Sequence, residues 1–98
     1  MATAARRGAD TLASALRAIG YTIAAIVALH VLLTLLDANP QNSFALLVRD
    51  VAQYVDLGLD TLFLPADPKL AVLLNYGVVA AVWFLATAVV VRLVRRLG

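Results

Sequence analysis

Two long runs of uncharged residues dominate the pattern of hydrophobic and polar positions along this chain. The first run covers residues 18–36, the second covers residues 70–91, and each is closed by a charged residue at both ends. As helices with a rise of ~1.5 Å per residue, they would be about 28 and 33 Å long, close to the ~30 Å hydrocarbon core of a bilayer. The pattern therefore predicts two membrane-spanning helices.

Residues 37–69, between the two runs, contain a second periodic pattern. Within residues 43–64, apolar positions recur at helical spacing on one side, and polar residues such as Arg49 and Asp56 recur on the other. This arrangement predicts an amphipathic helix, and its uncharged stretches are too short for a third span. Gly58 is a position where this helix is expected to bend or end early.

Side chains that accept hydrogen bonds from free N–H groups predict where the helices begin. Asp10 is expected to cap a helix that begins near Thr11 and continues into the first run, and Ser43 is expected to cap the amphipathic helix. Asp67 followed by Pro68 predicts the start of the second span, because proline is favoured at the first helical position.

The charged residues are distributed unevenly around the two runs. The segment 37–69 carries five aspartates against Arg49 and Lys69, whereas the flanks on the terminal sides are basic. The arginines of these flanks are Arg6, Arg7, Arg17, Arg92, Arg95 and Arg96. Because short cytoplasmic flanks retain Lys and Arg, residues 1–17 and 92–98 are expected in the cytoplasm and the middle segment outside it.

A cleaved signal peptide is the rival interpretation of the first run. The run is longer than the apolar region of about 7–15 residues that signal peptides carry, and no small-residue cleavage site follows it. A permanent span is therefore the favoured interpretation.

Composition narrows the chemistry. The chain has 98 residues, of which 63% are hydrophobic and 14% charged, so it forms one small domain without a separate soluble core. It has no cysteine, no phosphate-binding loop and no metal-ligand spacing, and we therefore expect no cofactor, no metal and no enzymatic activity. The acidic pair Asp56 and Asp60 is expected to be a solvated helix face. The preference for Arg over Lys hints at a bacterial genome rich in G and C.

One polar residue in each run stands out. His30 lies about 10 Å from the outer end of the first span, and Asn75 lies about 9 Å from the outer end of the second. In an antiparallel pair the two side chains would share one depth, so a hydrogen bond between them is expected to pin the hairpin. A contact with a partner, or proton or ligand chemistry, are the alternatives.

Small residues also recur at four-residue spacing. Gly20, Ala24 and Ala28 form such a series in the first run, and Gly77 and Ala81 form one in the second. Small residues allow two helices to approach closely in a membrane. Ala28 lies about 200° around its helix from His30, and Gly77 lies equally far around from Asn75. One face is therefore expected to build the hairpin and the other to meet a second protein or copy.

The order of elements resembles the YggT family of small bacterial membrane proteins. The residues that carry the resemblance are Leu35-Leu36-Asp37-Ala38-Asn39-Pro40-Gln41-Asn42, Val48-Arg49 and Leu62-Phe63-Leu64-Pro65. The chain departs from the family pattern in lacking a basic Pro-Phe-Arg-Arg-like run and a Gly-Gly…Asp-Leu-Ser-Pro segment. The resemblance implies a role in envelope organisation, division or osmotic response.

The sequence thus predicts an all-α membrane protein, a two-span antiparallel helical hairpin with an amphipathic extracytoplasmic helix between the spans. Its expected location is the bacterial cytoplasmic membrane, with both termini cytoplasmic. The expected function is that of a non-catalytic accessory or scaffold subunit that associates with itself or with another membrane protein. A homo-oligomeric pore or transporter component, with His30 and Asn75 lining a polar path, is the alternative. No nucleic acid and no small-molecule substrate is expected, since the arginine clusters are explained as topology signals.

Overall fold

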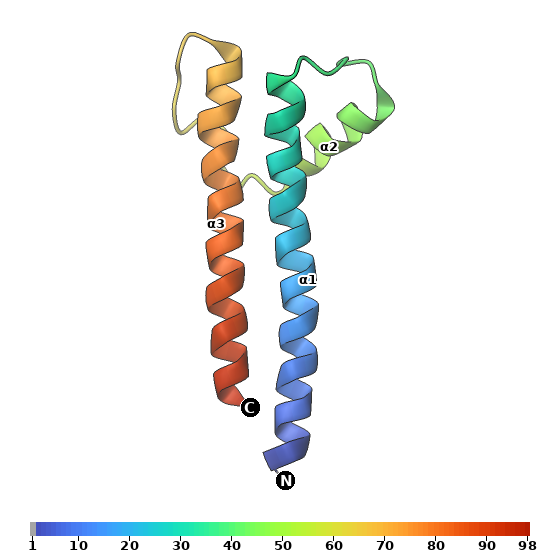
Figure 1. Cartoon of the computed structure of the whole chain (residues 1–98). Helices are drawn as coiled ribbons and strands as arrows, with labels where there is room; N and C mark the ends of the chain where they lie inside the picture. Colours follow the sequence, from blue (N-terminus) through green and yellow to red (C-terminus); the bar gives the residue numbers. More distant parts are fainter. Residues whose placement is uncertain (1) are drawn as a thin grey trace.

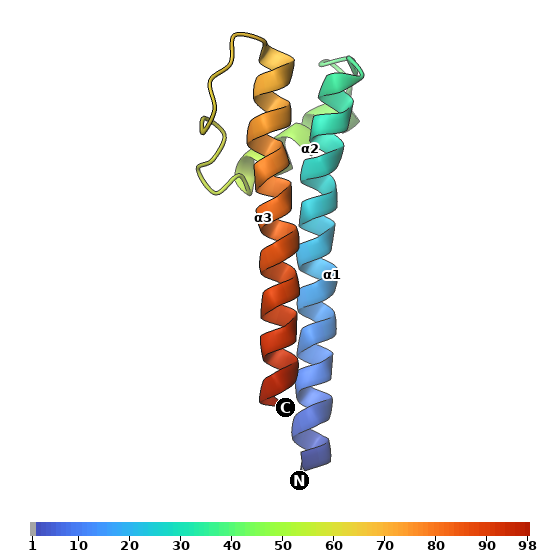
Figure 2. The ribbon, with the colours of Figure 1, turned by 60° about the vertical axis from the view of Figure 1, so that its left-hand side comes forward.

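The structure, a computed structural model, describes residues 2–98. Its helices are α1 (Ala2–Leu35), α2 (Ser43–Tyr54) and α3 (Pro68–Leu97), and these residues contain no strand. The two long helices run antiparallel side by side, and α2 leans against α1 near the end where the chain turns (Figures 1 and 2). We call this the loop end of the molecule, and the opposite end, where both termini lie, the terminal end. The predicted all-α class with two long apolar helices is confirmed.

Helices α1 and α3 touch along nearly their whole length. At the terminal end Gly98 lies against Ala9, and further along Gly20 lies against Thr87. At the loop end Lys69 pairs with the carboxylate of Asp37. The molecule is therefore a long, thin body, with principal extents of 57 × 27 × 18 Å.

The prediction that the first helix begins near Thr11 is wrong. Helix α1 already begins at Ala2, so Asp10 is an exposed position within the helix and caps nothing. Alanine, which is abundant in this segment, is the best helix former. Ala13 is fully buried, and Ala9 contacts the end of α3, so tertiary packing extends the helix backwards.

Helix α1 ends in a Schellman motif. Asp37 has a left-handed backbone with φ of 56°, and its N–H donates to the carbonyl of Thr34 at 3.2 Å. The N–H of Ala38 reaches back to the carbonyl of Leu33 at 2.9 Å. This pair of bonds satisfies carbonyls that the last helical turn leaves free, and it reverses the chain toward α2.

Helix α2 is capped by Asn42, not by Ser43 as predicted. The Asn42 side-chain oxygen accepts from the N–H groups of Phe44 at 2.9 Å and Ala45 at 3.2 Å, while Ser43 is the first helical residue. Both residue types cap helices well, so the sequence alone could place the start only to within one residue.

The predicted amphipathic helix over residues 43–64 is too long. Helix α2 ends at Tyr54, because Leu57 and Gly58 adopt left-handed φ values of 60° and 75° that no right-handed helix allows. The side chain of Asp56 accepts from the N–H of Gly58 at 2.9 Å, and Leu59 N–H closes the turn onto the Asp56 carbonyl at 3.0 Å. The remainder of the segment is irregular.

Helix α3 begins as the sequence predicts. Asp67 is its N-cap and accepts from the N–H of Lys69 at 3.0 Å, and Pro68 occupies the first turn. Proline fits there because its missing N–H would have had no helical partner.

The hydrophobic core lies in the loop half of the molecule, where three helices meet. Val27 and Val31 of α1, Ala52 of α2, and Tyr76 and Val79 of α3 form one buried cluster. In the terminal half only α1 and α3 remain, and they share a narrow seam. Only a few of the large apolar side chains on the two long helices are consequently fully buried.

Candidate functional site

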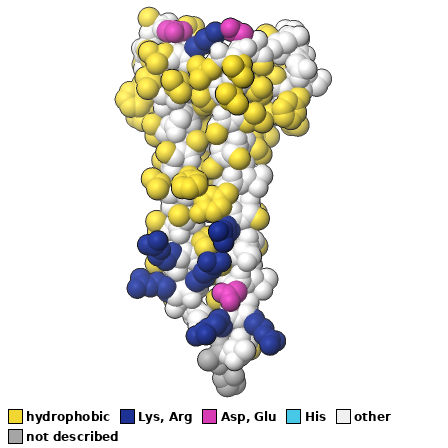
Figure 3. All heavy atoms as spheres, viewed as in Figure 1, with side chains coloured by type: hydrophobic (Ala, Val, Ile, Leu, Met, Phe, Trp, Pro, Cys, Tyr) yellow, Lys and Arg dark blue, Asp and Glu magenta, His cyan; other side chains and the backbone are white. Residues whose placement is uncertain are grey.

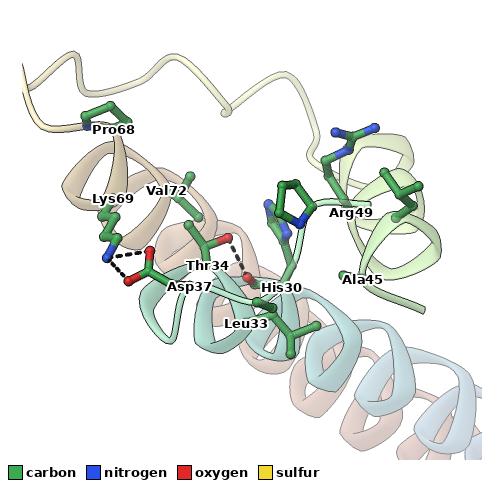
Figure 4. Close-up of a pocket in the computed structure, with 12 residues that line it drawn as sticks. His30, Leu33, Thr34, Asp37, Ala45, Arg49, Pro68, Lys69 and Val72 are labelled. Atoms are coloured by element: carbon green, nitrogen blue, oxygen red, sulfur yellow. Dashed lines mark hydrogen bonds and ion pairs between the residues drawn. The ribbon is translucent and has the colours of Figure 1, made fainter. Parts of the chain in front are cut away.

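A pocket of about 400 Å³ opens at the loop end, where the end of α1, helix α2 and the start of α3 meet. Its polar lining comes from His30, Thr34 and Asp37 of the α1 side, Arg49 of α2 and Lys69 of α3. Figure 4 shows His30 between the Lys69–Asp37 pair and Arg49.

His30 is nine-tenths buried, yet its imidazole has no hydrogen-bond partner among residues 2–98. Its ring stands edge-on to the ring of Tyr76, with centroids 4.8 Å apart and an interplanar angle of 86°. Its backbone carbonyl accepts from Thr34 Oγ1 at 2.8 Å. The side chain is thus fixed by packing and forms part of the pocket wall.

The charges around the pocket are largely neutralised. Lys69 Nζ lies 2.7 Å from both carboxylate oxygens of Asp37 and ties the end of α1 to the start of α3. Arg49 lies 3.6 Å from Asp50, a looser pair on the surface of α2. Both pairs are substantially exposed, so each contributes at most about 1 kcal/mol to stability.

Asn75 is buried as expected but does not bond to His30. Its Oδ1 accepts from the N–H of Phe63 at 2.7 Å, and its Nδ2 donates to the Phe63 carbonyl at 2.9 Å. The expected His30–Asn75 bond is therefore wrong, because the loop before α3 folds back and takes both hydrogen bonds of the amide. Asn75 is only 2% exposed, so its polar atoms could not be left unpaired.

Trp83 supplies a second bond to the same loop. Its Nε1–H donates to the carbonyl of Val55, just after α2, at 2.8 Å. Sequence reasoning overlooked this residue, although a buried indole N–H nearly always needs an acceptor. The Val55 carbonyl is free to accept this bond because α2 ends at Tyr54. A helix over residues 43–64, as predicted from the sequence, would have used that carbonyl internally.

These two bonds place the connecting segment, residues 55–67, beside α3 rather than beyond its end (Figure 2). Asn75 and Trp83 lie about 9 and 21 Å along α3 from Lys69. The extracytoplasmic location of residues 37–69 stays a prediction. Helix α2 and the connecting segment lie against the loop half of the helix pair.

The small residues divide between contact and surface. Gly20 and Ala24 lie in the seam between α1 and α3, where a Cβ on Gly20 would come within 2.6 Å of Cγ2 of Thr87. Ala28 and Ala81 are exposed, and a Cβ on Gly77 would meet nothing within 4 Å. The expected separation of small and polar faces does not hold for α1, because Ala24 and His30 are both buried.

The six terminal arginines are all exposed and lie on the terminal half of the molecule (Figure 3). They are Arg6, Arg7, Arg17, Arg92, Arg95 and Arg96. Asp56 is half-buried and Asp60 exposed, and residues 2–98 hold no group of three side chains suited to a metal. The pocket offers donors and a packed imidazole, without a nucleophile paired to a base.

Comparisons of this chain with protein families, with curated proteins and with solved structures gave no match. The resemblance to the YggT family stays a prediction.

Proposed function

We propose that this chain is a two-span protein of the bacterial cytoplasmic membrane that acts as a non-catalytic accessory or scaffold subunit. It associates with itself or with a larger membrane complex. The observation that carries this proposal is the apolar surface around the loop end, which the chain's own fold leaves uncovered. The members of this surface, which we call the apolar rim, are Phe44, Leu47, Tyr54, Leu57, Leu62, Phe63 and Leu64.

The membrane location is supported by the exposure of the two long helices. In their most apolar windows only 28% of the residues of α1 and 17% of those of α3 are buried. A core helix of a soluble protein would be mostly buried, because water does not tolerate so large an apolar surface. Lipid covers such a surface at no cost. The basic terminal end and the acidic loop segment support an orientation with both termini cytoplasmic.

In this proposal the connecting segment, residues 55–67, packs against the loop half of α3 and is shielded from lipid by the partner protein. Irregular backbone beside a span is tolerated only where it is buried in protein and its polar groups are satisfied. Asn75 serves both polar groups of Phe63, and Trp83 serves the carbonyl of Val55. The polar residues of the spans therefore support a structural role and not a conduction path.

The apolar rim supports association with another protein. Tyr54 is 94% exposed and Leu64 is 82% exposed. Tyrosine is enriched at protein interfaces, where a rigid ring covers a large area and the hydroxyl finds a partner. These exposed rim side chains contribute little to the packing of the chain's own helices.

A pore with His30 and Asn75 lining a polar path finds less support. The Asn75 amide is occupied by Phe63, and the His30 ring packs on Tyr76. The Asn75 amide is therefore not free to exchange hydrogen bonds with a passing ion, and the orientation of the His30 ring is fixed by packing.

The test is site-specific photo-crosslinking in the native membrane. A photo-reactive phenylalanine analogue at Leu64 samples the rim, and the same analogue at Val89, an exposed residue of the second apolar run in the terminal half, is the matched control. We expect one protein adduct of defined mass from position 64 and lipid adducts from position 89. Mild-detergent extraction then identifies the adduct as a second copy or a different protein. Lipid adducts alone at both positions, with a monomeric mass, would contradict the proposal.

A further inference from the structure

A basic groove of about 430 Å³ lies between α1 and α3 at the terminal end. Arg17 of α1 lines it from one side, and Arg92, Arg95 and Arg96 of α3 line it from the other, with Tyr21 at its inner end. Figure 3 shows basic side chains gathered on this half of the molecule, next to a band of hydrophobic ones. Helix spacing explains the convergence on α3, because residues three and four apart share a face.

Among residues 2–98, no acidic side chain lies within 4.0 Å of a guanidinium nitrogen of the four groove arginines. In the described part of the chain, ion pairs within 4.0 Å join Arg49 to Asp50 and Lys69 to Asp37, both at the loop end. Like charges that converge without a counter-charge repel one another, and they attract anions strongly beside a low-dielectric wall. Guanidinium groups bind phosphate with paired, charge-assisted hydrogen bonds.

The basic groove continues into an apolar one. Tyr21 also lines a neighbouring groove of about 560 Å³, which runs toward the loop end between the same two helices. The ring of Tyr21 packs against Phe84 with centroids 5.1 Å apart. Beyond this pair the groove is lined mainly by alanines, including Ala25, Ala28 and Ala81, whose small side chains leave the space open.

We propose that the two grooves together bind one anionic phospholipid. Its phosphate lies among the arginines of the basic groove, and one acyl chain lies along the alanines of the apolar groove. The arginines flank the apolar runs, where lipid head groups meet a spanning helix, and basic pockets between spans are known sites for such heads. Free phosphate or nucleic acid would use only the charged half. The proposal rests on the membrane location proposed above, but not on a scaffold role.

Native mass spectrometry of the purified full chain tests the proposal. The protein is released from micelles doped with equal amounts of phosphatidylglycerol and phosphatidylcholine, and the retained lipid is identified by mass. We expect one phosphatidylglycerol per chain, in preference to phosphatidylcholine. The Arg92→Gln/Arg95→Gln variant should lose this retention by about tenfold or more, since bidentate arginine–phosphate contacts are among the stronger polar contacts. Arg6→Gln/Arg7→Gln removes the same charge outside the groove and should retain the lipid.

A second variant pair tests the acyl-chain half. Ala81→Phe fills the apolar groove, whereas Ala86→Phe adds the same side chain to the opposite side of α3, where Ala86 lines a different groove. Only Ala81→Phe should reduce retention. An equal loss of lipid retention in both arginine variants would show diffuse electrostatic attraction. Displacement of the lipid by inorganic phosphate would show a simple anion site. Either result overturns the proposal. The experiment measures lipid bound to a single chain. A negative result would therefore refute the lipid site without bearing on whether the chain has a protein partner.

Discussion

The side-chain amide of Asn75 pairs with both backbone polar groups of Phe63, twelve residues earlier in the chain, at 2.7 and 2.9 Å. The amide thus satisfies the N–H and the carbonyl of Phe63 together, as a neighbouring backbone strand would. This relationship anchors the connecting segment to the span and accounts for a polar residue at a depth where polar groups are costly.

Replacing Asn75 with Leu should release the connecting segment. The change leaves the N–H and carbonyl of Phe63 unpaired, at a cost of about 1–3 kcal/mol. Amide hydrogen exchange at Phe63 in detergent should accelerate by about 5–150-fold, since ~1.4 kcal/mol corresponds to a factor of ten. Gln53→Leu, at an exposed amide of α2, is the control and should leave this exchange unchanged. An unaltered rate in Asn75→Leu would contradict the anchoring role.

The Trp83–Val55 bond predicts a smaller effect at the other end of the same segment. Trp83→Phe keeps an aromatic ring in place but removes the donor to the Val55 carbonyl, at a cost of about 1 kcal/mol. Limited proteolysis within residues 55–62 should become several-fold faster. Phe84→Leu, which changes a neighbouring exposed ring, should leave the cleavage rate as it is.

Gly20 and Gly77 should respond in opposite ways to a single methyl group. Gly20→Ala drives a Cβ into the side chain of Thr87 and should cost about 1–3 kcal/mol by overpacking. Gly77→Ala meets nothing within 4 Å and should be neutral or stabilising, because alanine favours the helix by ~1 kcal/mol. Thermal unfolding in detergent measures both. Adding Thr87→Ala to Gly20→Ala should restore the unfolding temperature. Lack of this rescue would argue against the contact between Gly20 and Thr87.

The turn after α2 predicts a stabilising substitution. Leu57 holds a left-handed φ of 60°, which costs a residue with a Cβ roughly 1–2 kcal/mol. Leu57→Gly removes this strain and should raise the unfolding temperature, although the added chain flexibility offsets part of the gain. Leu62→Gly, at another exposed leucine of the same segment, should give no increase.

Replacing His30 distinguishes the scaffold function from the pore function. His30→Leu should preserve the mass of the extracted complex and cost about 0.5–1.5 kcal/mol, the usual range for an edge-on aromatic pair such as that with Tyr76. Liposomes that hold the wild-type chain should show no ion flux above protein-free liposomes. Flux in the wild type that His30→Leu abolishes would instead favour the pore.

The sequence alone was sufficient to predict the two long helices, their apolar character and the start of α3 at Pro68. Those features depend on local hydropathy and on capping by Asp67, which act within a few residues along the chain. The charges at the helix ends likewise predict an orientation without any knowledge of packing.

Only the tertiary structure decided how the polar residues of the spans are used. Asn75 bonds to Phe63 and Trp83 to Val55 because the turn at Leu57 and Gly58 ends α2 early and sends the chain back along α3. That path depends on long-range contacts, which helical periodicity over residues 43–64 cannot report. The same holds for α1, whose early start depends on its contact with the far end of α3.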